Sequence, residues 1–172
     1  MDLLELIKTR RSIRKFDSTK PVSEETVQRI LEAAIWAPSA GNTQCWRFHV
    51  VRDAKLKQRL AVEAGHQPFI NEAPVVIVVC ADLHHVERSY GDRGRNTYAL
   101  QDTAAAIQNM LLTITSFGLG CCWIGAFNEE KAAEILNLPR GLRPLAMLPI
   151  GTPAERPKVP PRRLLDEVTT YR

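Results

Sequence analysis

The sequence predicts a protein of mixed helix and strand content, in which helices cover both sides of a central β-sheet. Helical apolar spacing alternates with strand-like runs, in the order helix, helix, strand, helix, strand, helix, strand, helix, strand. One run, Pro74 to Ala81, is largely β-branched, which is typical of a strand covered on both faces. The length of 172 residues is close to the ~150 expected of one domain. We therefore expect a single domain spanning residues 1–172.

The first half of the chain contains three of the expected helices and one strand. The apolar residues of 2–10 recur at helical spacing. Ser23 is a good N-cap for a second helix, because glutamates follow it in the first turn and an apolar stripe continues to Pro38. Residues 46–52 alternate like a half-buried strand, and residues 54–64 have the pattern of a charged surface helix.

The second half follows the same alternation. Residues 82–96 are polar and rich in His, Arg and Gly, which predicts a loop that could serve as a lid. A long helix is expected over 97–117, ended by the glycines that follow. Residues 121–127 are strand-like, Asn128 caps a helix that continues to Leu136, and residues 145–150 form a last strand.

The C-terminal tail, residues 153–172, is rich in proline. Four prolines between 153 and 161 exclude this stretch from the centre of a sheet. At ~3.1 Å per residue, the segment from Ile150 to Arg163 could reach ~40 Å. The tail is therefore either loose or wrapped over another surface, such as a second subunit.

Composition and charge exclude several classes of protein. The formal net charge of +4 is lower than that of most dedicated nucleic-acid binders. No apolar run approaches the ~20 residues of a membrane span. The first residues have no cleavable apolar core, so we expect a cytoplasmic protein with no membrane or nucleic-acid partner.

The four cysteines are expected to be buried free thiols. No two of them form a CxxC pair, and no spacing suits zinc. His84 and His85 lack acidic partners at ligand spacing, so we expect no metal site. The cysteine positions are Cys45, Cys80, Cys121 and Cys122.

A cluster of basic residues near the N-terminus is a candidate phosphate site. Arg10, Arg11 and Arg14 supply guanidinium groups, which match phosphate oxygens in a bidentate manner, and Ser12 adds a hydroxyl donor. The alternative is a solvated basic face anchored by its apolar neighbours. Arg162–Arg163 in the tail are either surface charge or a further phosphate clamp.

Two further segments could hold a flat ligand. Residues 37–44 are small and polar, and Asn42 and Gln44 can both donate and accept hydrogen bonds. Residues 123–127 contain Gly125, which permits a close approach to the backbone. Each segment could equally be an ordinary connection. The sequence contains no GxGxxG or Walker motif.

The segments RRSIRKF, APSAGNTQCW, GLGCCWIGAF and PPRRLLDEV, in this order, resemble the FMN-dependent nitroreductase family. The resemblance extends from Asp2 to about Val168. It implies an α+β sandwich with a central mixed β-sheet flanked by helices. It also implies a homodimer with one FMN at each end of the subunit interface.

The resemblance assigns roles to residues of this chain. The phosphate and ribityl chain would be held by Arg10, Arg11 and Ser12. Arg14 would lie at the pyrimidine edge of the flavin. The ring would be covered by residues of the other subunit, namely Pro38, Ser39, Ala40 and Asn42. The ring would also face Trp123, Ile124 and Gly125, with the Gly125 N–H directed at N5. Arg162, with Arg163 as a second candidate, would complete the phosphate site.

The implied activity is that of an FMN-dependent NAD(P)H oxidoreductase, which reduces nitroaromatic or quinone-type electrophiles in a ping-pong cycle with no catalytic side chain. Where larger family members carry an Asn and a Lys that hold the flavin, this chain offers only Gln67. Gly125 replaces an acidic residue of those members. A reductive dehalogenase or a flavin-fragmenting enzyme is the first alternative. A non-enzymatic anion- or RNA-binding module is disfavoured, because only 6% of residues are aromatic.

Overall fold

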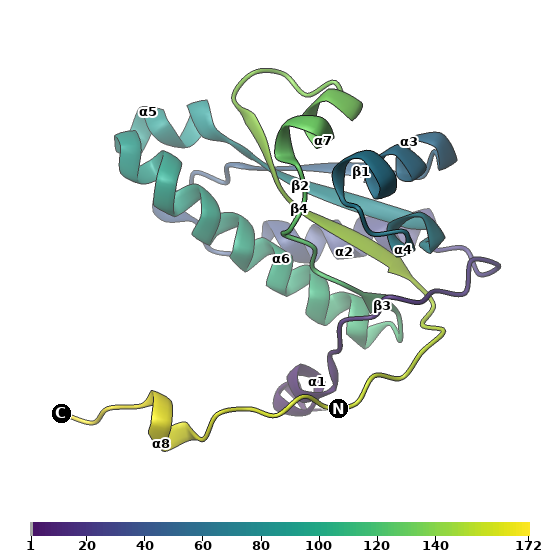
Figure 1. The fold of residues 1–172 in the computed structure, drawn as a ribbon. Coiled ribbons are helices and arrows are strands. Elements are labelled where there is room, and N and C mark those ends of the chain that lie inside the picture. Colours follow the sequence, from purple (N-terminus) through teal and green to yellow (C-terminus); the bar gives the residue numbers. More distant parts are fainter. Residues whose placement is uncertain (1) are drawn as a thin grey trace.

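The computed structural model describes residues 2–172 and is built around a four-stranded sheet (Figure 1). The strand order is β1-β2-β4-β3, and all three ladders are antiparallel. Ser12 and Cys121 also form an isolated bridge, in which the two segments run parallel to each other. The expected α+β architecture is confirmed, although the parallel part of the sheet is confined to this bridge. The strands are β1 (Trp46–Val51), β2 (Val75–Asp82), β3 (Gly120–Cys121) and β4 (Leu142–Gly151).

Helices cover both faces of the sheet, because the central strand β2 is apolar on both faces (Figure 1). Alternate residues of β2 belong to two different cores, as the two-residue period of a strand requires. Val75, Ile77 and Val79 pack with α2 and α6, whereas the residues between them pack with the helices of the other layer. The first layer is α2 (Glu24–Ile35) and α6 (Ala99–Ser116). The other layer is α3 (Ala54–Arg59), the π-helical turn η2 (Leu60–Ala64), α4 (Phe69–Glu72) and α7 (Glu129–Ile135).

The predicted helix starts are confirmed by their capping hydrogen bonds. The Ser23 hydroxyl accepts from the N–H of Thr26 at 3.1 Å, and the Asn128 side chain accepts from the N–H of Lys131 at 2.9 Å. Residues 54–64 are helical throughout, and the last expected strand is present with a longer N-terminal part.

The prediction of a loop over residues 82–96 is wrong. The segment forms α5 (Leu83–Arg93) and the π-helical turn η3 (Gly94–Tyr98), which continue directly into α6. Asp82 caps α5 by accepting from the N–H of His85 at 3.0 Å, and Leu83 and Val86 are buried beneath it. Tertiary burial of these two side chains overrides the loop-like composition of the segment.

Two smaller differences concern the segments on either side of β3. The strand expected over 121–127 ends at Cys121, because Trp123 turns outward and only Ile124 pairs again, in a bridge with Met147. Leu100 lies on the expected apolar stripe of α6 but is 42% exposed, so this end of α6 presents apolar surface to solvent.

The segment that follows α1 and the beginning of the C-terminal tail lie side by side near β3. After α1 (Leu3–Thr9), the extended segment 12–17 pairs with the beginning of the tail: the N–H of Ala154 donates to the carbonyl of Lys15 at 2.9 Å, and Phe16 bridges Pro153. Beyond this point the tail runs away from the body and carries the short α8 (Leu165–Val168) (Figure 1). Within residues 2–172, no helix is both long and apolar enough to cross a membrane.

Candidate functional site

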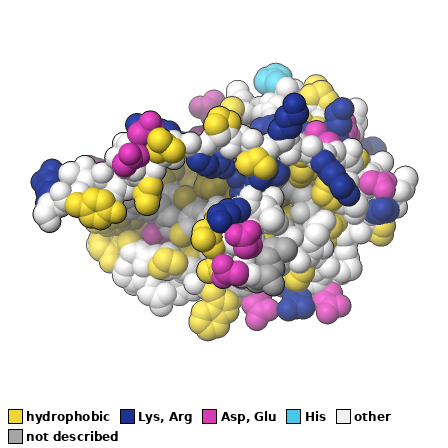
Figure 2. All heavy atoms as spheres, turned by 90° about the horizontal axis from the view of Figure 1, so that it is seen from below, with side chains coloured by type: hydrophobic (Ala, Val, Ile, Leu, Met, Phe, Trp, Pro, Cys, Tyr) yellow, Lys and Arg dark blue, Asp and Glu magenta, His cyan; other side chains and the backbone are white. Residues whose placement is uncertain are grey.

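The basic residues that follow α1 gather around a cavity of about 300 Å³, which we call the arginine cavity. Its walls come from residues 10–14 and from the tail, two segments that lie some 145 residues apart in the sequence but adjoin through the pairing described above. Figure 2 shows this face of the molecule, where Lys and Arg side chains gather near the base of the projecting tail. The lining residues are Arg10, Arg11, Ser12, Arg14, Pro157, Lys158, Pro160 and Arg162.

The cations of the arginine cavity are not equivalent. Arg11 donates from Nη1 to the carbonyls of Lys8 and Arg10, at 2.6 and 2.7 Å. Part of its guanidinium group is therefore already bonded to the backbone at the C-terminal end of α1. Arg162 lines the cavity, whereas Arg163 does not and pairs with Glu167 at 3.3 Å. Of Arg162 and Arg163, the structure therefore brings only Arg162 to the cluster.

Arg14 connects the arginine cavity to the segment that follows β3. Its backbone N–H donates to the carboxylate of Glu155 at 2.5 Å. Burial raises the pKa of the Cys122 thiol, and the nearby positive charge of Arg14 partly offsets this rise. The positive charge of Arg14 therefore lies near Cys122, the residue that precedes the segment of Trp123–Gly125.

The segment of Trp123–Gly125 offers an open backbone surface beside these cations. The N–H of Ile13 donates to the carbonyl of Cys121 at 3.0 Å, which holds the two segments side by side. Trp123 is 41% exposed, and a Cβ atom built on Gly125 would meet no atom within 4 Å. Gln67 donates from Nε2 to the carbonyl of Ala126 at 3.3 Å. The structure therefore brings Gln67, the 10–14 cluster and the 123–125 segment to one region.

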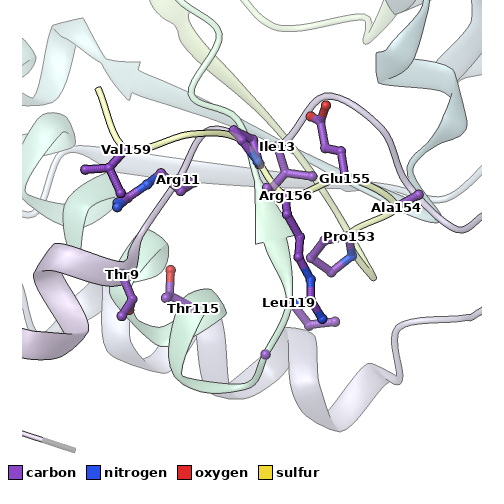
Figure 3. Close-up of a pocket in the computed structure, with 12 residues that line it drawn as sticks. Thr9, Arg11, Ile13, Thr115, Leu119, Pro153, Ala154, Glu155, Arg156 and Val159 are labelled. Atoms are coloured by element: carbon purple, nitrogen blue, oxygen red, sulfur yellow. The ribbon is translucent and has the colours of Figure 1, made fainter. Parts of the chain in front are cut away.

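A larger groove of about 950 Å³ continues from the arginine cavity, with Arg11 and Pro157 lining both. Figure 3 shows Arg156 extending along this groove towards Leu119, whereas the carboxylate of Glu155 points away from it. The groove is formed by the end of α1, the end of α6 and the tail. Its lining is largely apolar, with Thr9, Thr115 and Glu155 beside the two arginines, and this combination suits a ligand that joins a flat ring to an anion.

The loop of residues 38–42 lies elsewhere, at the N-terminal end of α6. The buried carboxylate of Asp102 accepts from the N–H of Ala40 at 3.0 Å and from the hydroxyl of Thr43 at 3.4 Å. Thr115, which lines the groove beside Arg11, lies 13 residues further along α6, or about 20 Å at 1.5 Å per residue. Within one chain, Pro38, Ser39, Ala40 and Asn42 therefore do not meet the arginine cavity.

Asp102, Lys158 and Tyr90 are the residues of interest that sequence reasoning missed. Asp102 holds the loop, Lys158 adds a cation to the cavity, and Tyr90 on α5 packs its hydroxyl end against Gly41. Asp102 is the one charged residue of α6, close to the stretch Ala104–Ala106, and this was the available signal, because a buried carboxylate requires partners.

The four thiols are free and buried, as predicted. Burial raises the pKa of Cys45 to about 11, with a smaller contribution from the negative charge of Asp102, and raises the pKa of Cys80 to about 12. Burial also raises the pKa of Cys121 and Cys122. The thiols are therefore protonated at neutral pH and do not supply a nucleophile. Among residues 2–172, no group of three or more His, Cys, Asp or Glu side chains is placed to hold a metal ion.

The chain is similar in sequence to a known protein family and to several of its members. The model of the Nitroreductase family matches residues 7–64 and 56–152. A provisionally named NADH dehydrogenase/NAD(P)H nitroreductase of Methanothermobacter thermautotrophicus is 37% identical over 161 residues, covering 91% of this chain and 80% of that protein. An FMN reductase (NADPH) of Bacillus subtilis is 32% identical, covering 96% of this chain and 73% of its own.

The fold is also shared with solved structures. The NADPH:FMN oxidoreductase of Vibrio harveyi, solved in complex with NAD+, superposes with a TM-score of 0.89 at 29% identity and covers 98% of this chain and 76% of its own. The family model spans most of the chain, and relatives above 30% identity match it over nearly its whole length. This chain belongs to the nitroreductase family.

Proposed function

We propose that this protein is an FMN-dependent NAD(P)H oxidoreductase that reduces nitroaromatic or quinone-type electrophiles. The observation that carries the proposal is the convergence of the arginine cavity with the open backbone at Gly125. Relatives named FMN reductase and NADPH-flavin oxidoreductase support the same cofactor and electron donor. FMN, when bound, supplies hydride transfer between the donor and the acceptor.

The residues of the arginine cavity fit a phosphate monoester. Arg10 presents a guanidinium fork, Arg162 presents a guanidinium whose Nη1 also donates to the carbonyl of Pro161 at 3.2 Å, Lys158 adds a compact cation, and the Ser12 hydroxyl can donate a hydrogen bond. We assign phosphate and ribityl binding to Arg10, Ser12 and Arg162. Arg11 contributes positive charge, while its Nη1 is bonded to backbone carbonyls at the end of α1. This one cluster of cations matches the single phosphate group of a mononucleotide.

Arg14 and the 123–125 segment are assigned to the ring. A cation at Arg14 favours the reduced, anionic state of a bound flavin. We assign the N–H of Gly125 to a ring nitrogen, because the open space where a Cβ atom would stand lets a flat ring approach the backbone, and Trp123 and Ile124 flank this contact. Gln67 is held beside this segment by its bond to Ala126 and supplies a further amide.

We further propose that the loop of Pro38, Ser39, Ala40 and Asn42 covers the ring bound to a second copy of the chain. The separation of about 20 Å along α6 prevents a single chain from bringing the loop to its own arginine cavity. Leu3, Leu4 and Leu165 are each more than half exposed, as is Tyr171 in the tail. A homodimer in which the tail packs on the partner would bury these side chains.

The first experiment identifies the cofactor. We expect the purified protein to be yellow, to release FMN on heating, and to be bleached anaerobically by NADH or NADPH. A colourless protein that takes up no added FMN would favour the anion-binding alternative. Arg10→Ala and Arg163→Ala form a matched pair, because only Arg10 lines the cavity: the first should lose FMN on dilution and the second should keep it.

The second experiment tests the shared site. Arg10→Ala damages the cavity, and Ala40→Phe blocks the loop, so each homodimer is inactive. In a heterodimer of the two variants, one site collects both defects and the other has none, because the sites are related by twofold symmetry. Activity that returns on co-refolding supports a loop contributed by the partner. Failure to recover activity, with heterodimers present, indicates that the loop acts within its own chain, and an active Ala40→Phe homodimer indicates that the loop does not cover the ring.

A further inference from the structure

A second cleft, of about 610 Å³, lies between β1, the start of α5 and the turn that leads into β4; we call it the β1–α5 cleft. It is separated from the arginine cavity by the width of the sheet, because β1 and β3 are the two edge strands. Figure 1 shows α5 and the α7–β4 connection on the side of the molecule away from the tail. Its lining includes Arg47, Phe48, Asp82, Arg88, Arg140 and Leu142.

The β1–α5 cleft carries an excess of positive charge. Arg47 pairs with Asp82 at 3.3 Å, and Asp82 is the only carboxylate in the lining. Arg88 and Arg140 make no ion pair among the described residues, so two guanidinium groups remain for a ligand. Leu142 supplies apolar surface beside them, and His49, which also lines the cleft, supplies a flat ring on the same face of β1 as Arg47. Phosphate beside an aromatic group is the chemistry that suits this combination.

The walls of the β1–α5 cleft are held in place by the fold. The N–H of Leu83 donates to the carbonyl of Gly141 at 2.8 Å, which ties the start of α5 to the turn. Gly141 has a φ of +88°, and the ring of His84 packs where a Cβ atom would otherwise stand. Arg140 is therefore presented from a turn whose conformation and packing both require glycine.

A chain of hydrogen bonds connects the β1–α5 cleft to the loop of residues 37–44. His85 Nε2 lies 2.9 Å from the carbonyl of Thr43 and must donate to it, since a carbonyl only accepts. The neutral ring then accepts at Nδ1 from Arg88 Nη2, 3.2 Å away. Arg88 is thus positioned through His85 by the loop that, under the proposed function, covers the flavin of the partner.

We propose that the β1–α5 cleft binds the phosphate-bearing adenosine half of the nicotinamide dinucleotide donor. This inference rests on the proposed function, because the donor must reach a flavin of the partner that loop 37–44 of this chain covers. The two guanidinium groups that make no ion pair complement phosphate charge, Leu142 and the ring of His49 accept the adenine, and the arginine cavity remains free for FMN.

Direct binding tests the cleft independently of activity. The probe is adenosine 2′,5′-bisphosphate, titrated by calorimetry into FMN-saturated protein so that the arginine cavity is already filled. We expect Arg88→Gln and Arg140→Gln each to weaken binding about tenfold, the usual effect of losing one charge-assisted contact. Arg59→Gln, which removes an exposed charge paired with Glu63 outside the cleft, should bind the probe like the wild type.

Kinetics then identify the ligand of the cleft. If the cleft holds the donor, Arg88→Gln and Arg140→Gln raise the KM for NADPH about tenfold without changing kcat or FMN affinity. Loss of bisphosphate binding with an unchanged KM would overturn the assignment to the donor. Inorganic phosphate that binds as tightly as the bisphosphate, and is lost in the same variants, would overturn it as well. Absence of any bisphosphate binding to the wild type overturns the site itself.

The two proposals fail in different ways. A protein that takes up FMN but oxidises neither NADH nor NADPH contradicts the proposed function, whereas the calorimetric comparison of Arg88→Gln with Arg59→Gln still measures the cleft. A protein that oxidises NADPH with the same KM in both variants contradicts only the inference about the cleft.

Discussion

Replacing Asp102 by alanine should destabilise the protein and loosen the loop of residues 38–42. The carboxylate is buried in α6 and accepts from the N–H of Ala40 at 3.0 Å and from the hydroxyl of Thr43 at 3.4 Å. The shorter bond dominates, because the hydroxyl contact is near the limit of hydrogen-bond length. Loss of a hydrogen bond to a charged acceptor costs about 1.5–3 kcal/mol.

This free energy can be converted into a melting temperature. For a chain of this size, 1 kcal/mol corresponds to roughly 2–4 °C, so Asp102→Ala should lower Tm by roughly 3–12 °C. Asp102→Asn retains an acceptor for the N–H of Ala40 and should recover part of this loss. Thermal unfolding followed by circular dichroism measures both, with Glu32→Ala as the control because Glu32 is exposed on α2.

The same substitution also tests the role of the loop. If the loop covers a bound flavin, Asp102→Ala should release FMN more readily than the wild type at a temperature where both are folded. An Asp102→Ala protein with the Tm and FMN affinity of the wild type would show that the Asp102–Ala40 contact does not hold the loop, and the reasoning would be refuted.

Three further predictions concern other residues. Arg14→Ala should lower the midpoint potential of bound FMN by roughly 30–60 mV, because a charge-assisted hydrogen bond contributes about 1.5–3 kcal/mol; an unchanged potential in a spectroelectrochemical titration would place Arg14 with the phosphate. Ser23→Ala should reduce the free energy of unfolding by about 1 kcal/mol in urea denaturation, because the cap of α2 is lost, and no change would contradict the capping role. Above pH 9 the unfolded chain ionises its thiols while the folded chain keeps Cys45 protonated up to about 11, so stability falls as pH rises between these values. Cys45→Ala should flatten this decline, and an unchanged slope would refute its cause.

The sequence by itself determined the layered architecture and the cation cluster. The periodicity of β2 and of its flanking helices reflects burial on two faces, which is a local property of the side chains. The caps at Ser23 and Asn128 are equally local, since each side chain bonds to an N–H three residues away. Arg10, Ser12 and Arg14 lie within five residues, so their proximity was also readable from the sequence.

Only the tertiary structure decided which distant residues meet these local features. Composition indicated a loop at 82–96, but burial of Leu83 and Val86 made it a helix, because packing outweighs the weak intrinsic preference of a short segment. The choice between Arg162 and Arg163 depends on the course of a proline-rich tail that has no periodic pattern. The position of the Asp102-bound loop at the far end of α6 likewise follows from how the chain folds back on itself. Such contacts are set by the summed burial of the whole core, which no single stretch of sequence encodes.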